Sequence, residues 1–541
     1  MSRIFISHSR LDQREAVALK QWLVEKDQTL KDEIFLDVDP VTGILPGVRW
    51  REELKRASGR CEAVITLLSA NWEASMECRT EFRTAENLNK VIFCARLEPD
   101  VGADLTGEWQ YCDLFGGDDP VSVDIGVKEP VIFNGHGLRR LLTGIERAGV
   151  GVSSFPWPPA GQLDRAPYRG WEPFEDVDAG VFFGRDAELV LAMDALRGMR
   201  QADKTLFVVL GASGAGKSSF LRAGLVPRLQ KDDRNYLVLN IVRPERKALT
   251  GASGLAQAVC ATRQRLGLLD PPLGEIKDAC TSGDAARLAT WLIECRDVAS
   301  GQLLDNTADG EPLMIVVPLD QAEELFTGDG PEAAGLLALF RDMALGAGDE
   351  DGLPLIVAAT IRTDRYELMQ SAPELARLQT EQFDLRAMDV TQFKNVITGP
   401  AQRSTDAGRT LRLDEQLVRR LLADASGGAD TLPLLSLTMA WLYRDFGSKG
   451  RLSLRPYTER GGIGSVVQTE IDALLSVDAE ERDEQLKILR SAFIPWLARI
   501  NPLSNEPMRR VAQWTDLPEA SRPLIGEFVA KRLLVKDERD G

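Results

Sequence analysis

Two patterns of hydrophobic and polar positions alternate along the first 150 residues. Short apolar runs are typical of buried strands, and stretches with apolar residues every three or four positions are typical of helices. The apolar runs are 3–9, 33–37, 63–69, 90–97 and 130–135, and the helical stretches are 12–27, 76–89 and 136–149. This alternation predicts an α/β domain with a parallel sheet. Such sheets bind ligands beyond the carboxyl ends of their strands, which here carry residues 7–9, 37–47 and 69–81.

A segment rich in Pro, Gly and Ser, residues 149–167, reads as a linker before a second α/β pattern. There, GASGAGKS fits the spacing G-x-x-x-x-G-K-[ST] and stands between an apolar run and a helical stretch. The N–H groups of such a loop cradle phosphates, Lys217 would reach the β- and γ-phosphates, and Ser218 would hold Mg²⁺. The motif predicts binding of ATP or ADP with Mg²⁺ at Gly211, Gly214, Gly216, Lys217, Ser218 and Ser219.

Two later apolar runs supply the partners that a phosphate-binding loop requires. The run at 312–326 reaches Asp320, the expected second Mg²⁺ ligand, and Glu323 or Glu324 could orient the attacking water. The run at 353–369 reaches Arg362, which either senses the γ-phosphate or forms an ion pair with an acidic residue. Pro318 is unusual in this setting, because proline is rare in a central strand.

Composition and charge narrow the functional classes. The 65 Lys and Arg residues and 82 Asp and Glu residues give a net charge of −17. This disfavours general binding of phosphate backbones, although a local basic face can lie within an acidic total. Seven Cys without a CxxC pair indicate reduced thiols, and two His disfavour a zinc site or a Ser-His-Asp hydrolase. With no signal peptide and no membrane-spanning run, we expect a cytoplasmic protein.

The first 149 residues resemble a bacterial TIR domain, which implies a flavodoxin-like fold. The resemblance rests on FISHSRLD, FLDVDPVTGILPG and VITLLSANWEAS in this order, followed by Cys78 and Glu81. Many TIR domains are NAD⁺ nucleosidases, and Glu81 matches the family's catalytic Glu, three residues after a Cys. The loop at 37–47 resembles the family's mobile BB loop. The NAD⁺-pocket candidates are Ser7, His8, Asp37, Gly43, Trp72 and Cys78.

The sequence also departs from this family. Glu77 stands where a Trp often precedes the Cys, and Ser7-His8 stands where the first strand often ends Ser-Tyr. Other TIR domains are scaffolds, so a non-enzymatic adaptor remains an alternative. In that case Glu81 is one more solvated carboxylate on a helix.

The remainder resembles a STAND-class P-loop NTPase, a relative of the NACHT and NB-ARC switches of immune receptors. The resemblance rests on PYRGWEPFEDVDAGVFFGRDAEL, the P-loop, LDQAEELF and ATIRTDRY. It implies that Phe183, Gly184, Arg185 and Pro433 lie against the nucleotide. The predicted domains are a TIR domain (1–149), a linker (150–166), an NTPase core (167–390), a helical lid (391–448) and a winged-helix domain (449–541).

Together these resemblances imply a nucleotide-switched immune receptor. On sensing a trigger, for which a phage protein is one candidate, the STAND module would self-associate. Its assembled TIR domains would then hydrolyse NAD⁺ to nicotinamide and ADP-ribose or a cyclic form. In a bacterium this is abortive antiphage defence. The last residues, DERDG, read as a wing hairpin without its second strand, so we expect a longer protein with a C-terminal sensor. A transcription regulator that binds DNA through the winged helix is a further alternative, disfavoured by the net charge.

Overall fold

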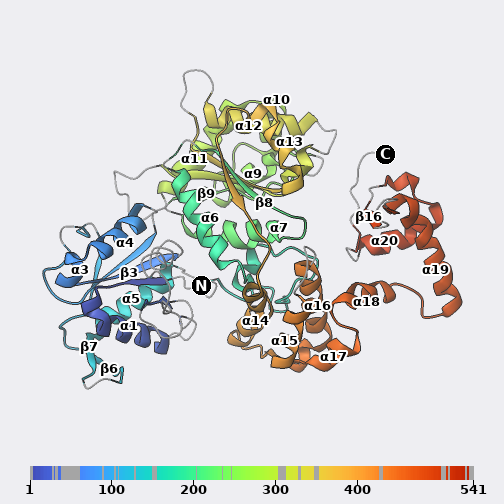
Figure 1. Ribbon diagram of the computed structural model, residues 1–541. Coiled ribbons are helices and arrows are strands. Elements are labelled where there is room, and N and C mark those ends of the chain that lie inside the picture. The colour runs from blue at the N-terminus through green and yellow to red at the C-terminus, as the bar shows by residue number, and fades with distance from the viewer. Residues whose placement is uncertain are drawn as a thin grey trace. The chain divides into compact units, whose positions relative to one another are not determined.

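The computed structural model divides into two units, residues 1–165 with 174–387 and residues 166–173 with 388–541 (Figure 1). The described residues are 4–26, 30, 34–37, 61–87, 90–102, 105–107, 109–126, 129–148, 155–200, 202, 204–233, 235–244, 247–301, 312–326, 331–346, 352–425, 431–500, 507–509, 512–530 and 533–534. No helix in these ranges is long and apolar enough to cross a membrane.

The first sheet of the first unit is parallel throughout. Its strands are β1 (Ile4–Ser7), β2 (Ile34–Phe35), β3 (Ala63–Leu68), β4 (Val91–Arg96) and β5 (Tyr111–Asp113). They lie in the order β2-β1-β3-β4-β5. This is the flavodoxin-like order, so the predicted fold of the N-terminal domain is confirmed.

Helices cover both faces of this sheet, because successive strand residues point to opposite sides. Ile4 and Ile6 pack in a buried cluster with α1 (Gln13–Lys26) and α5 (Gly135–Ala148). Phe5 packs in another cluster with α3 (Ala70–Ala74) and α4 (Met76–Asn87). Figure 1 shows the two helix pairs on either side of β3. A short 3₁₀ helix, η1 (Arg10–Asp12), leads into α1.

The expected fifth strand at 130–135 is wrong for this sheet. β7 (Val131–Asn134) pairs antiparallel with β6 (Pro120–Val123) in a separate two-stranded sheet. The fifth position belongs to β5, which has three half-buried residues, YCD. Three residues with so little apolar content carry no recognisable strand pattern, whereas β7 alternates buried Val131 and Phe133 with exposed Ile132.

The second sheet of the first unit is also parallel. Its strands β8 (Leu206–Gly211), β9 (Tyr236–Val238), β10 (Met314–Leu319), β11 (Leu355–Arg362) and β12 (Thr380–Asp384) lie in the order β12-β8-β11-β10-β9. One face packs on α9 (Leu255–Arg265), α10 (Leu273–Ser282), α11 (Ala285–Gly301) and α12 (Pro331–Leu345). The other packs on α6 (Asp186–Met199), the π-helical segment η5 (Phe220–Leu225) and α8 (Val226–Lys231).

Pro318 lies inside central strand β10, and the hydrogen bonds explain how it fits. The carbonyl groups of Val316 and Pro318 face the β9 side, where they accept from Leu239 and Val242. The missing N–H of Pro318 therefore also faces β9, which has already ended at Val238. The proline removes no bond from the ladder with β11, so its cost to the sheet is small.

The second unit is mainly helical. Helices α14 (Val390–Asp406), α15 (Glu415–Asp424), α16 (Thr431–Phe446) and α17 (Leu454–Glu459) share one buried cluster. Two short strands, β13 (Arg412–Leu413) and β14 (Arg451–Leu452), pair in parallel beside them. Buried Tyr168 belongs to this unit and donates to the Ile397 carbonyl at 2.5 Å. The helices predicted for residues 391–448 are present, and the role of this segment as a lid stays a prediction.

A separate buried cluster forms the end of the second unit. It involves α19 (Ala479–Ala492), the π-helical segment η11 (Phe493–Leu497) and α20 (Arg522–Ala530), and α18 (Val466–Asp472) leads into it. Strands β15 (Ala498–Ile500) and β16 (Pro507–Arg509) pair antiparallel. The winged-helix assignment and the domain boundaries stay predictions, and the expected wing at 535–541 lies outside the described residues.

Candidate functional sites

The first candidate site lies where the order of the first sheet reverses, at the carboxyl ends of β1 and β3. Ser7 is the last residue of β1, and its hydroxyl donates to Glu81 Oε2 on α4 at 2.6 Å. The indole N–H of Trp72, on α3, donates to the same hydroxyl oxygen at 3.1 Å. Because the indole N–H can only donate, it directs the Ser7 proton toward the carboxylate. Three predicted residues therefore form one chain of hydrogen bonds.

The loops that carry these residues are tied together by Asp12, which the sequence analysis did not identify. Its carboxylate accepts from the Ser69 hydroxyl at 2.5 Å and from the Asn71 amide at 2.8 Å. Ser69 in turn caps α3 by accepting from the Trp72 backbone N–H at 3.0 Å. An Asp after one strand and a Ser-x-Asn after another are weak signals, because each is common in turns.

Glu81 has an unusual electrostatic environment. Desolvation raises the pKa of its carboxyl group from 4.5 to about 7, the charges of Asp37 and Glu77 add to this, and the hydrogen bond from Ser7 opposes it. A buried carboxyl group that titrates near neutral pH is a candidate for catalysis. The group can change between a proton donor and a carboxylate at the pH of a cell.

The other residues predicted for the NAD⁺ pocket differ in their positions and contacts. His8 Nε2 lies 3.6 Å from Asp37 Oδ1, a buried oxygen that accepts no hydrogen bond within the described part of the chain. Cys78 is buried, and desolvation raises the pKa of its thiol to about 11, so it stays protonated and serves packing. Trp72 is fully buried against Phe82 and reaches the site through its N–H. Gly43 lies outside the described residues.

The raised pKa predicts a specific effect of Glu81→Gln on stability. The folded state binds the Glu81 proton more tightly than the unfolded chain, so this group's contribution to the unfolding free energy falls as pH rises from 4.5 to about 7. Glutamine does not titrate. We expect thermal or urea unfolding to show that the variant gains up to about 3 kcal/mol relative to wild type between pH 4.5 and pH 8. The exposed Glu77→Gln is the control; a difference independent of pH contradicts the assigned pKa.

The second candidate site follows β8, an interior strand of the second sheet that lies between β12 and β11. Gly211 ends β8, and Gly214 and Gly216 have φ angles of 76° and 86°, which favour glycine. Helix α7 (Lys217–Ser219) begins directly after this loop. The Lys217 ammonium donates to the carbonyls of Gly211 and Ala212 at 3.0 and 2.9 Å, so its charge lies over the loop. The strand–loop–helix arrangement required by the motif is present.

The segment with Phe183, Gly184 and Arg185 contacts the backbone of this loop through its arginine. The Arg185 side chain is 2% exposed and donates to the Ala215 carbonyl at 2.9 Å and to the Arg386 carbonyl at 2.8 Å. Gly184 has a φ of 90°, and Phe183 is half-buried. Ser219, predicted to bind nucleotide, accepts a hydrogen bond from the Phe174 N–H at 3.1 Å. Arg185 thus acts as a brace for the loop backbone.

Asp320 is fully buried directly after β10. Its Oδ1 accepts from the Thr360 hydroxyl at 2.7 Å, and its Oδ2 accepts from Arg222 Nε and Nη2 at 2.9 and 2.8 Å. Arg222 also pairs with Glu175 at 2.8 Å. Hydroxyl and carboxylate oxygens are the ligands that Mg²⁺ prefers, so Ser218 and Asp320 fit the predicted metal site, where the ion would neutralise phosphate charge.

Arg222 is the main residue that sequence reasoning missed here. It lies four positions after Ser218 in continuous helical structure, so helical spacing places it on the Ser218 face. That spacing is a usable signal once Ser218 is assigned. Nothing in the sequence alone indicates which of the acidic residues Arg222 contacts.

We expect the substitution Arg222→Met to lower the free energy of unfolding by an amount that depends on Mg²⁺. The change leaves the buried Asp320 carboxylate without its cation, which costs about 3 kcal/mol. If Asp320 is a Mg²⁺ ligand, Mg²⁺ with ADP restores more stability in the variant than in wild type. Differential scanning fluorimetry with and without Mg²⁺ measures this, with Arg287→Met on α11 as an exposed control. An equal loss in both conditions contradicts the assignment of Asp320.

The residues around Asp320 form the rest of the site. Gln321 has a φ of 59°, a strained backbone that is common at functional sites. Desolvation raises the pKa of Glu323, and the Lys217 charge opposes this. Glu324 lies 3.6 Å from Arg243. Desolvation also lowers the pKa of Lys217, and the charges of Glu323 and Asp320 oppose this.

The predicted nucleotide contacts of Arg362 and Pro433 are not seen directly in the structure. Arg362 pairs with Asp364 through two hydrogen bonds of 2.9 and 2.8 Å, which is the ion-pair alternative for this residue. Its role toward a γ-phosphate stays a prediction. Pro433 lies in the first turn of α16 in the second unit, and its contact with nucleotide also stays a prediction.

Comparison with known proteins identifies the families that the two parts of the chain match. Residues 167–540 match the family described as Novel STAND NTPase 1, and residues 4–124 match the TIR domain family. No curated protein is significantly similar in sequence. Among solved structures, a Walker-type ATPase of Pyrococcus abyssi is 14% identical over 69% of this chain and 90% of its own, with a TM-score of 0.34. The Orc2 protein of Aeropyrum pernix, in ADPNP and ADP complexes, is 12% identical over 64% and 94%, with a TM-score of 0.36.

The family match spans more than half of the chain and begins where the second α/β pattern begins. The P-loop, the buried Asp320 and the parallel sheet that carries them are the parts that a nucleotide-binding NTPase requires. The chain belongs to the STAND NTPase family described as Novel STAND NTPase 1, and it carries a TIR domain ahead of the NTPase.

Proposed function

We propose that this chain is a nucleotide-switched signalling enzyme whose TIR domain hydrolyses NAD⁺. The observation that carries the proposal is the Trp72–Ser7–Glu81 chain of hydrogen bonds, which holds a carboxyl group with a pKa of about 7 at the ligand-binding edge of the sheet. Glu81 also stands at the position of the catalytic Glu in the TIR resemblance.

The chemistry needs little from the protein beyond this carboxylate. The bond between ribose C1′ and nicotinamide N1 breaks, and nicotinamide leaves with the electron pair because its ring nitrogen is already cationic. The ribosyl group becomes an oxocarbenium ion, which the Glu81 carboxylate stabilises while it holds the ribose hydroxyls. Water adds at C1′ and loses a proton, giving ADP-ribose. Asp37 Oδ1, which accepts no hydrogen bond from the described residues, is an acceptor available to a substrate hydroxyl.

The NTPase module would control when TIR domains meet. ATP and Mg²⁺ bind at the P-loop, and a trigger that binds the open state more tightly than the closed state shifts the equilibrium toward open chains. Open chains self-associate and bring their TIR domains together. In a bacterial cell the resulting loss of NAD⁺ would end phage replication with the host, which is abortive antiphage defence in the cytoplasm.

Separation of the products tests the enzymatic part of this proposal. The chain is incubated with NAD⁺, ATP and Mg²⁺, and nicotinamide and ADP-ribose are quantified by chromatography while light scattering follows assembly. We expect equal amounts of nicotinamide and ADP-ribose, or of nicotinamide and a cyclic product. Assembly without any release of nicotinamide supports the alternative of a non-enzymatic TIR adaptor, which the departures at Glu77 and His8 favour.

A further inference from the structure

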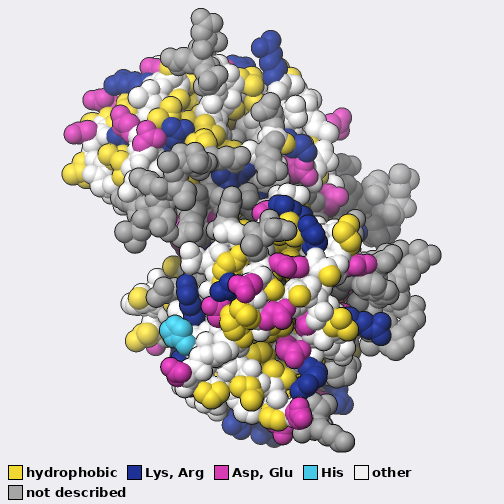
Figure 2. Space-filling view, turned by 90° about the vertical axis from the view of Figure 1, so that its left-hand side faces the viewer, with side chains coloured by type: hydrophobic (Ala, Val, Ile, Leu, Met, Phe, Trp, Pro, Cys, Tyr) yellow, Lys and Arg dark blue, Asp and Glu magenta, His cyan; other side chains and the backbone are white. Residues whose placement is uncertain are grey.

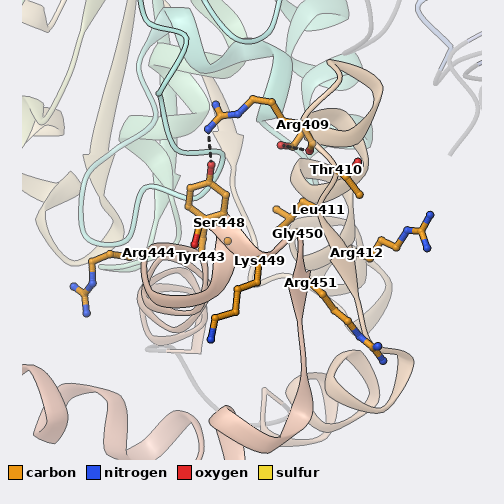
Figure 3. Close-up of a pocket in the computed structure, with 12 residues that line it drawn as sticks. Arg409, Thr410, Leu411, Arg412, Tyr443, Arg444, Ser448, Lys449, Gly450 and Arg451 are labelled. Atoms are coloured by element: carbon orange, nitrogen blue, oxygen red, sulfur yellow. Dashed lines mark hydrogen bonds between the residues drawn. The ribbon is translucent and has the colours of Figure 1, made fainter.

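A hollow of about 810 Å³ lies in the second unit, between the ends of α14 and α16 and the strands β13 and β14 (Figure 3). None of its 12 lining residues is Asp or Glu. Five of them are Lys or Arg: Arg409, Arg412, Arg444, Lys449 and Arg451. We call this feature the basic hollow. Because the whole chain has a net charge of −17, this concentration of cations is local. On the face drawn in Figure 2, in contrast, Lys and Arg side chains are interspersed with Asp and Glu.

The backbone places two of these cations side by side. β13 and β14 are paired in parallel with Arg412 opposite Arg451. Like charges at paired strand positions repel and destabilise the sheet. Asp414 offsets one of them through a 2.6 Å contact with Arg451, but in the described part of the chain no carboxylate forms an ion pair with Arg412. An anion bound in the basic hollow would remove this repulsion.

An aromatic ring is fixed next to a third cation. Arg409 Nη2 donates to the Tyr443 hydroxyl at 2.9 Å, and the Tyr443 ring lies 6.3 Å from the ring of Tyr168. A Cβ at Gly447 would lie 2.7 Å from Tyr443 Cδ2, so glycine leaves the room that this ring occupies. The half-buried ring and the guanidinium group form a rigid pair at the wall of the basic hollow (Figure 3).

The remaining cations are spread over the opening. Lys449 lies over the Phe446 ring at 5.2 Å, and Arg444, 59% exposed, pairs with Asp445. In Figure 3 the Arg412 and Arg451 side chains extend on one side and Arg444 on the other, with Lys449 between them. Cations that diverge in this way suit a row of spaced anions better than one compact anion.

We propose that the basic hollow binds the phosphate backbone of a nucleic acid, with Tyr443 in contact with a base. Proteins that bind single-stranded nucleic acids combine a basic groove with aromatic side chains on which bases stack. Among the described residues, no large exposed hydrophobic side chain lines the hollow. A lipid surface would need such a side chain for insertion, so a nucleic acid fits the hollow better than a membrane. An acidic chain binds phosphate backbones only through such a local basic surface.

Fluorescence anisotropy of the full chain tests this binding. The probes are a labelled single strand of about 30 nucleotides and the matching duplex, titrated between about 50 and 200 mM salt. ADP and Mg²⁺ are kept saturating so that the P-loop is not available to the probe. The paired variant Arg412→Glu/Lys449→Glu should weaken binding of the single strand at least tenfold and lower the salt slope by about 2.

The matched control is Arg419→Glu/Arg455→Glu, which changes the net charge equally at exposed arginines that pair within their own helices. This control should keep the affinity within about twofold. Three results overturn the proposal: no binding by wild type at the lowest salt, an equal loss in the control, or equally tight binding of a polyglutamate peptide of matched charge. Arg412→Gln/Lys449→Gln, with an unchanged unfolding midpoint, should reproduce the lower slope without charge reversal.

Discussion

Glu81→Gln is expected to lower the kcat of nicotinamide release at least about 100-fold. The variant keeps the size of the side chain and an oxygen that can accept from Ser7, but it removes the charge that stabilises the oxocarbenium ion. Because NAD⁺ is also held by other pocket residues, KM should change much less than kcat. Chromatographic quantification of nicotinamide over a range of NAD⁺ concentrations separates the two parameters.

The control for this prediction is Glu77→Gln, one turn earlier on α4. Glu77 is exposed, and its charge is the smallest of the contributions that act on the pKa of Glu81. We expect nicotinamide release by this variant within about threefold of wild type. Retained activity in Glu81→Gln would mean that Glu81 is an ordinary helix carboxylate, and the catalytic assignment would then be wrong.

Lys217→Ala is expected to weaken ATP binding about 100-fold, which corresponds to about 2.8 kcal/mol. The Lys217 ammonium lies over the P-loop carbonyls, where it would meet the β- and γ-phosphates as a charge-assisted donor. Isothermal titration calorimetry with a non-hydrolysable ATP analogue and Mg²⁺ measures the change. If assembly needs ATP, the variant should also remain dispersed in light scattering.

Lys277→Ala, which removes a lysine on α10, controls for the loss of one positive charge. Its affinity for the ATP analogue should match that of wild type within about twofold. Unchanged affinity in Lys217→Ala would place the nucleotide elsewhere and remove the basis for the switch.

Local motifs predicted the strand–loop–helix arrangement of the P-loop, because these three elements are adjacent in the sequence. Gly211 to Ser219 needed no long-range information, and the buried strand before Asp320 was visible as an apolar run. The ion pair between Arg222 and Asp320 joins residues 98 positions apart, so only packing of the helix against the sheet reveals it.

In the first site, too, the local motif could be predicted from the sequence and the long-range contacts could not. Glu81 was found from its position after Cys78, but its link to Ser7 and Trp72 depends on the register of β1 beside β3 and on the placement of α3. The strand β5 was missed because three half-buried residues carry too little pattern. The basic hollow was missed because its cations come from two short segments that pair only in the folded unit.

The rate of nicotinamide release per chain, measured over a range of protein concentrations, tests the central claim most directly. Parallel series contain ATP with Mg²⁺, ADP with Mg²⁺, or no nucleotide. The account predicts that the rate per chain rises with concentration when ATP is present and stays low in the other series. A rate per chain that is independent of concentration and nucleotide would contradict the switch, and no release in any series would contradict the NAD⁺ hydrolase.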